Sequence, residues 1–228
     1  MIWAIFFVAV LALVFGPSLW VRWVMRTYSG ELQGMPGTGG ELAQHLIDKF
    51  ELTGVGVEIT EVGDHYDPTD KKVRLLAEHF DNKSLTAVAI AAHEVGHAIQ
   101  DHQQDSRLNA RTRLIPVADQ IAKWSVRALW AAPVVGFLTR HPVPFSLMVA
   151  VGLAGFIGRM LVHVVTLPIE FDASFAKALP ILKQGEYIAP GEEVHVRRIL
   201  KAAAYTYVAA ALADVLNLAR WAAILLRR

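Results

Sequence analysis

The first 21 residues of the chain, MIWAIFFVAVLALVFGPSLWV, contain no charged side chain. A helix needs about 20 consecutive apolar residues to cross the hydrocarbon core of a bilayer. A cleaved signal peptide would begin with basic residues, whereas here Arg22 and Arg26 follow the apolar run. We therefore expect residues 1–24 to form an uncleaved transmembrane anchor. The basic end of an anchor usually lies in the cytoplasm.

Two apolar segments, separated by a short break at residues 140–144, lie between residues 115 and 167. The first carries Asp119, Lys123 and Arg127 at intervals of four residues, which places them on one helix face. We expect both segments to be membrane-associated helices, with this polar face turned towards protein.

Charged residues also interrupt the later apolar segments. Arg159 and His163 lie in the second segment, and Asp214 lies in a final apolar helix expected over residues 201–228. Charges inside a span usually face protein or water and often mark function. For Arg159 the alternative is a side chain that extends to the membrane interface. The final helix either spans the membrane or lies against the other helices.

The composition agrees with a chain that lies partly in lipid and partly in water. Hydrophobic residues make up 54% of the chain and charged residues 19%, against about 25% charged in soluble domains. The net charge of +1 gives no indication of a nucleic-acid partner. Because the chain has no cysteine, any metal ion would be held by His, Asp or Glu.

Residues 25–114 contain most of the polar sequence. A helix is expected over Glu41–Glu51, and the alternating sequence GVGVEITEV predicts a strand. Asp67-Pro68 predicts a turn and Lys72–Leu76 a return strand, which together predict a β-hairpin over residues 55–76. Ser84 is a suitable N-cap for the following apolar helix, SLTAVAIAAHEVGHAIQ.

That helix contains the sequence His93-Glu94-Val95-Gly96-His97, which is the pattern HExxH. Residues i and i+4 lie on one helix face about 6 Å apart along the axis, so both imidazoles can bind one zinc ion. From the neighbouring face Glu94 can reach a zinc-bound water as a general base. The alternative is a helix with two surface histidines, but burying this group in an apolar helix is costly unless a metal satisfies it.

A catalytic zinc ion needs a third protein ligand and a position for water. The metzincin pattern would place a histidine at position 103, and Gln103 excludes that class. Asp101 is too far from His93 along the helix axis, by about 12 Å, for one ion to bind both.

Glu170, in the sequence LPIEFDAS, is the better candidate. Pro168 predicts the start of a new helix, and two apolar segments between His97 and Glu170 would return the chain to the same membrane face. We expect Glu170 to be the third ligand, as in gluzincins; the alternative is an interfacial carboxylate favoured by the helix dipole. Asp172 or Ser174 could accept a hydrogen bond from a zinc-bound imidazole and fix its tautomer.

The sequences AAHEVGHAIQ, DHYDP, LPIEFDAS and AAAYTYVAAAL together resemble the YugP-like neutral zinc metallopeptidases, a family of small bacterial membrane proteins. The resemblance covers nearly the whole chain. It implies zinc ligands at His93 and His97 and a catalytic Glu94, and it agrees with Glu170 as the third ligand. HtpX-type membrane gluzincins are more distantly similar, but they have Asp where this chain has Ser174.

The sequence Asp64-His65-Tyr66-Asp67-Pro68 supports two interpretations. In the first, the hairpin lies beside the active site, its edge strand pairs with an extended substrate, and His65 or Tyr66 stabilises the oxyanion. In the second, it is a plain Asp-Pro turn with a packed tyrosine.

We therefore expect a mainly α, integral-membrane helical bundle with a gluzincin-like HExxH helix and a small β-hairpin. Its expected parts are an anchor (1–24), a zinc-binding catalytic region (25–114), two membrane-associated helices (115–167), a third-ligand helix and loop (168–200) and an apolar helix (201–228).

The expected function is that of a zinc-dependent endopeptidase with one zinc ion, acting on peptides or proteins. The expected location is the bacterial inner membrane, with the active site facing the cytoplasm. One alternative is a non-catalytic membrane scaffold or partner protein that zinc stabilises. Another is a zinc or proton transporter that uses Arg159, His163 and Asp214.

Overall fold

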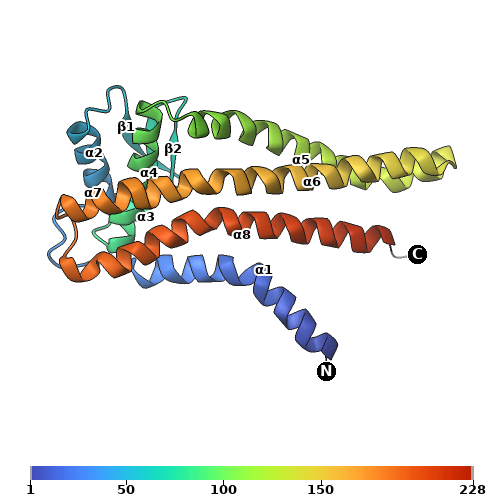
Figure 1. The fold of residues 1–228 in the computed structure, drawn as a ribbon, viewed down its shortest axis with the longest axis horizontal. Coiled ribbons are helices and arrows are strands. Elements are labelled where there is room, and N and C mark those ends of the chain that lie inside the picture. The colour runs from blue at the N-terminus through green and yellow to red at the C-terminus, as the bar shows by residue number, and fades with distance from the viewer. Residues whose placement is uncertain (1, 227–228) are drawn as a thin grey trace. The chain divides into compact units, whose positions relative to one another are not determined.

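A computed structural model describes residues 2–226 of the chain. The protein is mainly helical and has one small sheet, which confirms the expected fold class (Figure 1). The elements in chain order are α1 (Ile2–Thr27), α2 (Gly39–Lys49), β1 (Gly56–Thr60), β2 (His65–Asp67), β3 (Lys72–Leu76), α3 (Ala77–Phe80), α4 (Leu85–His102), α5 (Ser106–Thr139), α6 (Pro142–Phe171), the π-helix η1 (Asp172–Ala178), α7 (Leu179–Gln184), the 3-10 helix η2 (Pro190–Glu192) and α8 (Glu193–Leu226).

The chain divides into two compact units. The first, which we call the sheet unit, comprises Ser18–Asn109 and Leu167–Thr206. The second, which we call the long-helix unit, comprises the described residues of Met1–Pro17, Ala110–Thr166 and Tyr207–Arg228. Each of the long helices has residues in both units; these helices are α1, α5, α6 and α8.

Helix α4 is the centre of the sheet unit, and every residue from Leu85 to Gln100 is buried. The oxygen of Ser84 accepts a hydrogen bond from the backbone N–H of Ala87 at 3.2 Å, which confirms the expected N-cap. Helix α2 begins with a capping box between Thr38 and Glu41. Apolar side chains of α2, the sheet, α4, α7 and α8 share one core in this unit.

The sheet has the strand order β1-β3-β2. Strand β1 pairs in parallel with β3, so the prediction of a hairpin between these two strands is wrong. The hairpin is the antiparallel pair β2–β3, and its turn begins at Pro68, directly after Asp67 at the end of β2. Arg74 on the central strand β3 links both neighbours, since its guanidinium bonds to Glu58 of β1 and to Asp67 of β2, each at 2.6 Å.

The prediction that Pro168 starts a new helix is also wrong. Pro168 lies inside α6, and the helical chain continues through η1 into α7. A proline within a helix removes one hydrogen bond. Here the next two residues, Ile169 and Glu170, are each only 1% exposed, and their burial outweighs this local preference.

Three helical segments are long and apolar enough to cross a membrane: Ser106–Thr139, Pro142–Gln184 and Pro190–Trp221. They include both expected central segments and the C-terminal one. The expected N-terminal anchor is helical as α1, and its membrane crossing stays a prediction. Met1, Arg227 and Arg228 lie outside the described residues.

Within the long-helix unit, α5 and α6 form an antiparallel helical pair (Figure 1). A Cβ atom at Gly155 of α6 would overlap Ser125 of α5, so the two helices approach closely there. This contact buries the small-residue face of α5. On the charged face of α5, Lys123 and Arg127 are exposed, whereas Asp119 is half-buried and its carboxylate lies 4.0 Å from Arg159 Nε of α6. The structure therefore turns only the Asp119 part of this face towards protein.

Candidate metal centre

Three buried side chains converge in the sheet unit. His93 and His97 come from α4, and Glu170 comes from the last turn of α6. The Oε2 atom of Glu170 lies 3.3 Å from His93 Nε2 and 3.4 Å from His97 Nε2. One ligand atom from each residue can be chosen so that all lie within 4.8 Å of one another. The exposed fractions of the three residues are 4%, 3% and 1%.

A glycine lets the two ligand-bearing segments meet. A Cβ atom at Gly96, between the histidines, would lie 2.9 Å from the backbone oxygen of Ala173 in η1. Any larger residue at position 96 would therefore push η1 away from α4. Because Gly96 has no side chain, the segment around Ala173 can approach α4 closely. Glu170, one helical turn before Ala173, and Ser174, directly after it, can then reach the histidines.

Gln100 orients the imidazole of His97. Its Nε2 donates hydrogen bonds to the backbone oxygen of Ile169 at 3.0 Å and to Asp172 Oδ2 at 2.8 Å. These two acceptors assign the amide nitrogen, so the amide oxygen faces His97 Nδ1 at 2.8 Å. His97 Nδ1 is therefore the protonated ring nitrogen, and the Nε2 lone pair points towards Glu170.

Ser174 orients His93 in the same way. Its hydroxyl donates to the backbone oxygen of Leu200 in α8 at 3.2 Å. Its oxygen lies 3.1 Å from His93 Nδ1 and accepts the Nδ1 proton. Both histidines are thus held in the tautomer that leaves Nε2 available to a metal ion.

Of the two residues expected to contact an imidazole, Ser174 does so directly and Asp172 through Gln100. The carboxylate of Asp172 also lies 3.3 Å from Lys177 Nζ and 3.8 Å from Arg107. Sequence reasoning overlooked Gln100, although a glutamine among apolar residues one turn after His97 was a detectable signal. A buried amide in an apolar helix requires hydrogen-bond partners.

The residues present fit a zinc ion. Zinc is commonly bound by imidazole nitrogens and carboxylate oxygens, and catalytic sites use three such protein ligands. Among the described residues, His93, His97 and Glu170 are the group of this kind close enough to hold one ion. Glu94 follows the first histidine on α4 and is also buried, with 6% of its surface exposed.

His65 and Tyr66, the other expected site residues, have local partners. His65 Nδ1 lies 2.8 Å from the backbone oxygen of Gly63. The Tyr66 hydroxyl donates to Asp101 Oδ2 at 2.7 Å, and burial and this bond raise the pKa of Tyr66. The Lys71 ammonium also pairs with Asp101 Oδ2, at 2.7 Å. These bonds attach the sheet to α4 one turn beyond His97.

A second polar cluster lies in the long-helix unit. Asp214 of α8 is 4% exposed, and its Oδ2 lies 3.3 Å from both Arg159 Nε and His163 Nε2 of α6. The structure thus brings together the charged residues that interrupt these apolar helices. Their mutual pairing accounts for the burial of Asp214.

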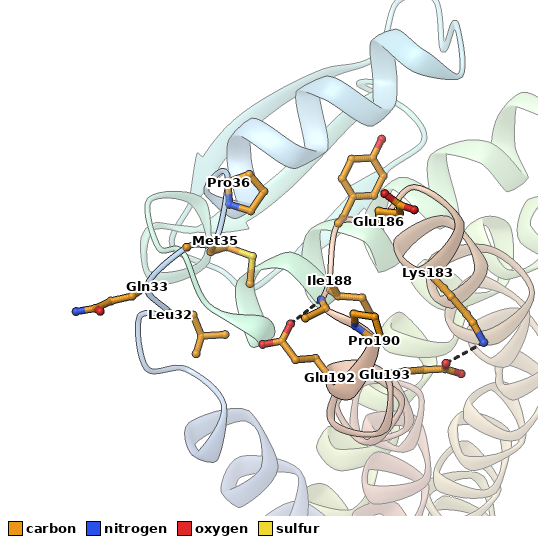
Figure 2. A pocket seen from close by; sticks show the side chains of 13 residues that line it. Leu32, Gln33, Met35, Pro36, Lys183, Glu186, Ile188, Pro190, Glu192 and Glu193 are labelled. Carbon is orange, nitrogen blue, oxygen red and sulfur yellow. Dashed lines mark hydrogen bonds and ion pairs between the residues drawn. The ribbon is translucent and has the colours of Figure 1, made fainter.

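A cavity of about 820 Å³ lies elsewhere in the sheet unit, between residues 32–36 and the segment 183–193 (Figure 2). Leu32, Met35 and Ile188 contribute apolar surface to it. Some of the polar groups that line the cavity already pair with each other: Lys183 with Glu193, and the backbone N–H of Ala189 with the carboxylate of Glu192. None of the expected site residues lines this cavity.

The fold and the cluster together define a class: mainly helical proteins with membrane-length helices and a His-His-Glu group of the kind that binds zinc. Comparison with known proteins agrees with this class. The family model described as "Putative neutral zinc metallopeptidase" matches residues 3–226, and the chain belongs to that family.

A curated relative is similar over most of its length. The chain is 32% identical over 217 residues to the protein named "Putative membrane protease YugP" from Bacillus subtilis (strain 168), covering 92% of each chain. This finding confirms the resemblance to the YugP-like family that the motifs indicated. No solved structure matches the chain.

Proposed function

We propose that this protein is a membrane-bound, zinc-dependent endopeptidase of gluzincin type. The observation that carries the proposal is the convergence of His93, His97 and Glu170 within 4.8 Å, with each imidazole oriented through its Nδ1. In this proposal these three residues bind one zinc ion. The family match and the membrane-length helices support the same function.

In the proposed hydrolysis, each residue around the metal cluster has its own role. A bound zinc ion would polarise the scissile carbonyl and lower the pKa of the attacking water. Glu94 takes the proton from that water and transfers it to the leaving amine. Gln100 and Ser174 hold the imidazoles in place, and the apolar neighbours of α4 exclude bulk water, which strengthens the electrostatic interactions in the site.

The number of ligands separates this proposal from a zinc-stabilised scaffold. A structural zinc site is closed by four protein ligands, whereas a catalytic site has three and keeps one position for water. Among the described residues the cluster has three members, and a buried Glu94 adjoins it. Both features favour catalysis.

The test compares three proteins purified in detergent and loaded with zinc. Glu94→Gln should keep its zinc and its thermal stability but lose at least about 100-fold in peptide cleavage, since a general base contributes typically 10²–10⁴-fold. Glu170→Ala should lose zinc, measured by elemental analysis. Wild-type cleavage by a folded, zinc-loaded Glu94→Gln protein would overturn the proposed role of Glu94, and unchanged zinc in Glu170→Ala would remove Glu170 from the ligands.

We also propose that the site faces the cytoplasm, because Arg22 and Arg26 directly follow the apolar run of α1. The chain has no cysteine, so a single introduced one reports on topology. Val62, in a turn of the sheet unit, is 91% exposed. Val62→Cys should resist a membrane-impermeant thiol reagent in intact cells and react after lysis. Reaction in intact cells would reverse the assigned orientation.

A further inference from the structure

A basic pocket of about 440 Å³ lies between α1 and α8 within the sheet unit. It is separate from the metal cluster, and the proposed hydrolysis makes no use of it. Its lining residues are Trp20 and Trp23 of α1 and Val194, Arg197, Arg198 and Lys201 of α8.

The charged side chains that line the pocket are all cations. Arg198 donates to the hydroxyl of Tyr28 at 3.2 Å, and the Lys201 ammonium lies 5.4 Å from the centre of the Tyr205 ring. These aromatic partners hold the cations in position without neutralising their charge.

Among the described residues, an acidic partner is found for Arg197 of this pocket. Arg197 lies 3.3 Å from Glu193, which also pairs with Lys183 at 2.9 Å. One carboxylate therefore serves two cations, and the pocket keeps a net positive charge. An anion that enters it would meet two guanidinium groups and one ammonium, which bind phosphate well.

The position of the pocket at the ends of two apolar helical segments indicates where an anionic ligand would come from. Trp20 lies one residue before the end of the uncharged run in α1, and the cations lie near the start of the membrane-length segment Pro190–Trp221. Tryptophan is enriched where membrane helices meet the headgroup layer. Trp23, which lines the pocket, is 55% exposed, and Leu19, one helical turn earlier on α1, is 62% exposed, so both offer apolar surface on this part of α1.

We propose that this pocket binds the headgroup phosphate of an anionic phospholipid from the surrounding membrane. Arg197, Arg198 and Lys201 bind the phosphate, and the exposed side chains of Leu19 and Trp23 contact the acyl chains. Basic pockets beside membrane helices suit such headgroups. A soluble anion would gain nothing from the apolar surface, and for this reason the lipid is the favoured occupant.

Native mass spectrometry of the full chain tests the proposal. The protein is released from micelles that contain equal amounts of phosphatidylglycerol and phosphatidylcholine, and the bound lipid is identified. Wild type should retain phosphatidylglycerol preferentially. Each cation contributes about fivefold near a membrane surface, so the triple variant Arg197→Gln/Arg198→Gln/Lys201→Gln should lose on the order of 100-fold of that preference.

The matched control removes three exposed cations elsewhere, as Arg113→Gln/Lys123→Gln/Arg140→Gln. It has the same change in net charge and should keep the lipid preference. If the triple variant does not fold, the single variant Lys201→Gln tests the proposal instead. Its preference for phosphatidylglycerol should fall about fivefold.

Three outcomes would overturn the proposal. In the first, the pocket variants retain the wild-type preference. In the second, the control loses as much as the pocket variant, which would show only general attraction between charges. In the third, soluble glycerol 3-phosphate displaces the lipid at equal concentration, which would make the pocket a site for free phosphate compounds. The readout does not depend on peptidase activity.

Discussion

Replacing Gln100 by methionine tests how the metal cluster is built. Methionine has nearly the volume of glutamine but forms none of its hydrogen bonds, so the substitution removes the bonds to His97, Ile169 and Asp172. Asp172 keeps Lys177 as a partner at 3.3 Å. The buried groups left without their partner are therefore the His97 Nδ1–H and the Ile169 carbonyl.

The size of the effect follows from these contacts. Each buried polar group without a partner costs about 1–3 kcal/mol, so Gln100→Met should lower the free energy of unfolding by about 2–6 kcal/mol. Loss of a hydrogen-bond partner of a metal-binding histidine typically lowers metal affinity 10- to 100-fold. We expect a loss of zinc affinity within that range, because His97 can then rotate or change tautomer.

The assay is a competition for zinc between the purified protein and a chelator of known affinity, together with thermal unfolding at saturating zinc. Gln103→Met is the matched control, because Gln103 lies one turn further along and its side chain is exposed. Wild-type zinc affinity in Gln100→Met would refute the proposed orientation of His97. An equal loss in Gln103→Met would show that the effect is not specific to this network.

Two further substitutions test other parts of the sheet unit. Gly96→Ala should weaken zinc binding and destabilise the protein by about 1–3 kcal/mol through overpacking against Ala173. The control Gly158→Ala, whose Cβ would meet nothing within 4 Å, should do neither; similar zinc affinities in the two variants would contradict this reasoning. Burial lowers the pKa of His79, but the hydrogen bond and charge of Asp64 outweigh it and raise that pKa above 6.5. This stabilisation is complete below pH 6.5 and is lost as the pH rises through the raised pKa. Asp64→Asn should therefore lower the unfolding temperature more at pH 6 than at pH 9, and equal losses would contradict the assignment.

Local sequence patterns predicted the helices well. The cap at Ser84, the helix after it and the apolar segments depend on neighbours within about four residues along the chain, and the structure contains all of them. The i, i+4 spacing of His93 and His97 likewise places both imidazoles on one face of any α-helix.

The errors arose where distant residues compete with local preference. The parallel pairing of β1 with β3 depends on contacts between segments separated by β2, including the bond from Arg74 to Glu58. The continuation of α6 through Pro168 depends on the burial of the residues that follow it. Local preference is weak compared with such burial.

The positions of the apolar segments and the residue types available for zinc follow from local sequence. The tertiary structure is needed to show how these residues meet. It placed η1 against Gly96, gave His97 and His93 their partners Gln100 and Ser174, and gathered the cations of α8 beside the tryptophans of α1. The physical reason is that hydrogen bonds and close contacts between segments far apart in the chain depend on packing, which no local pattern encodes.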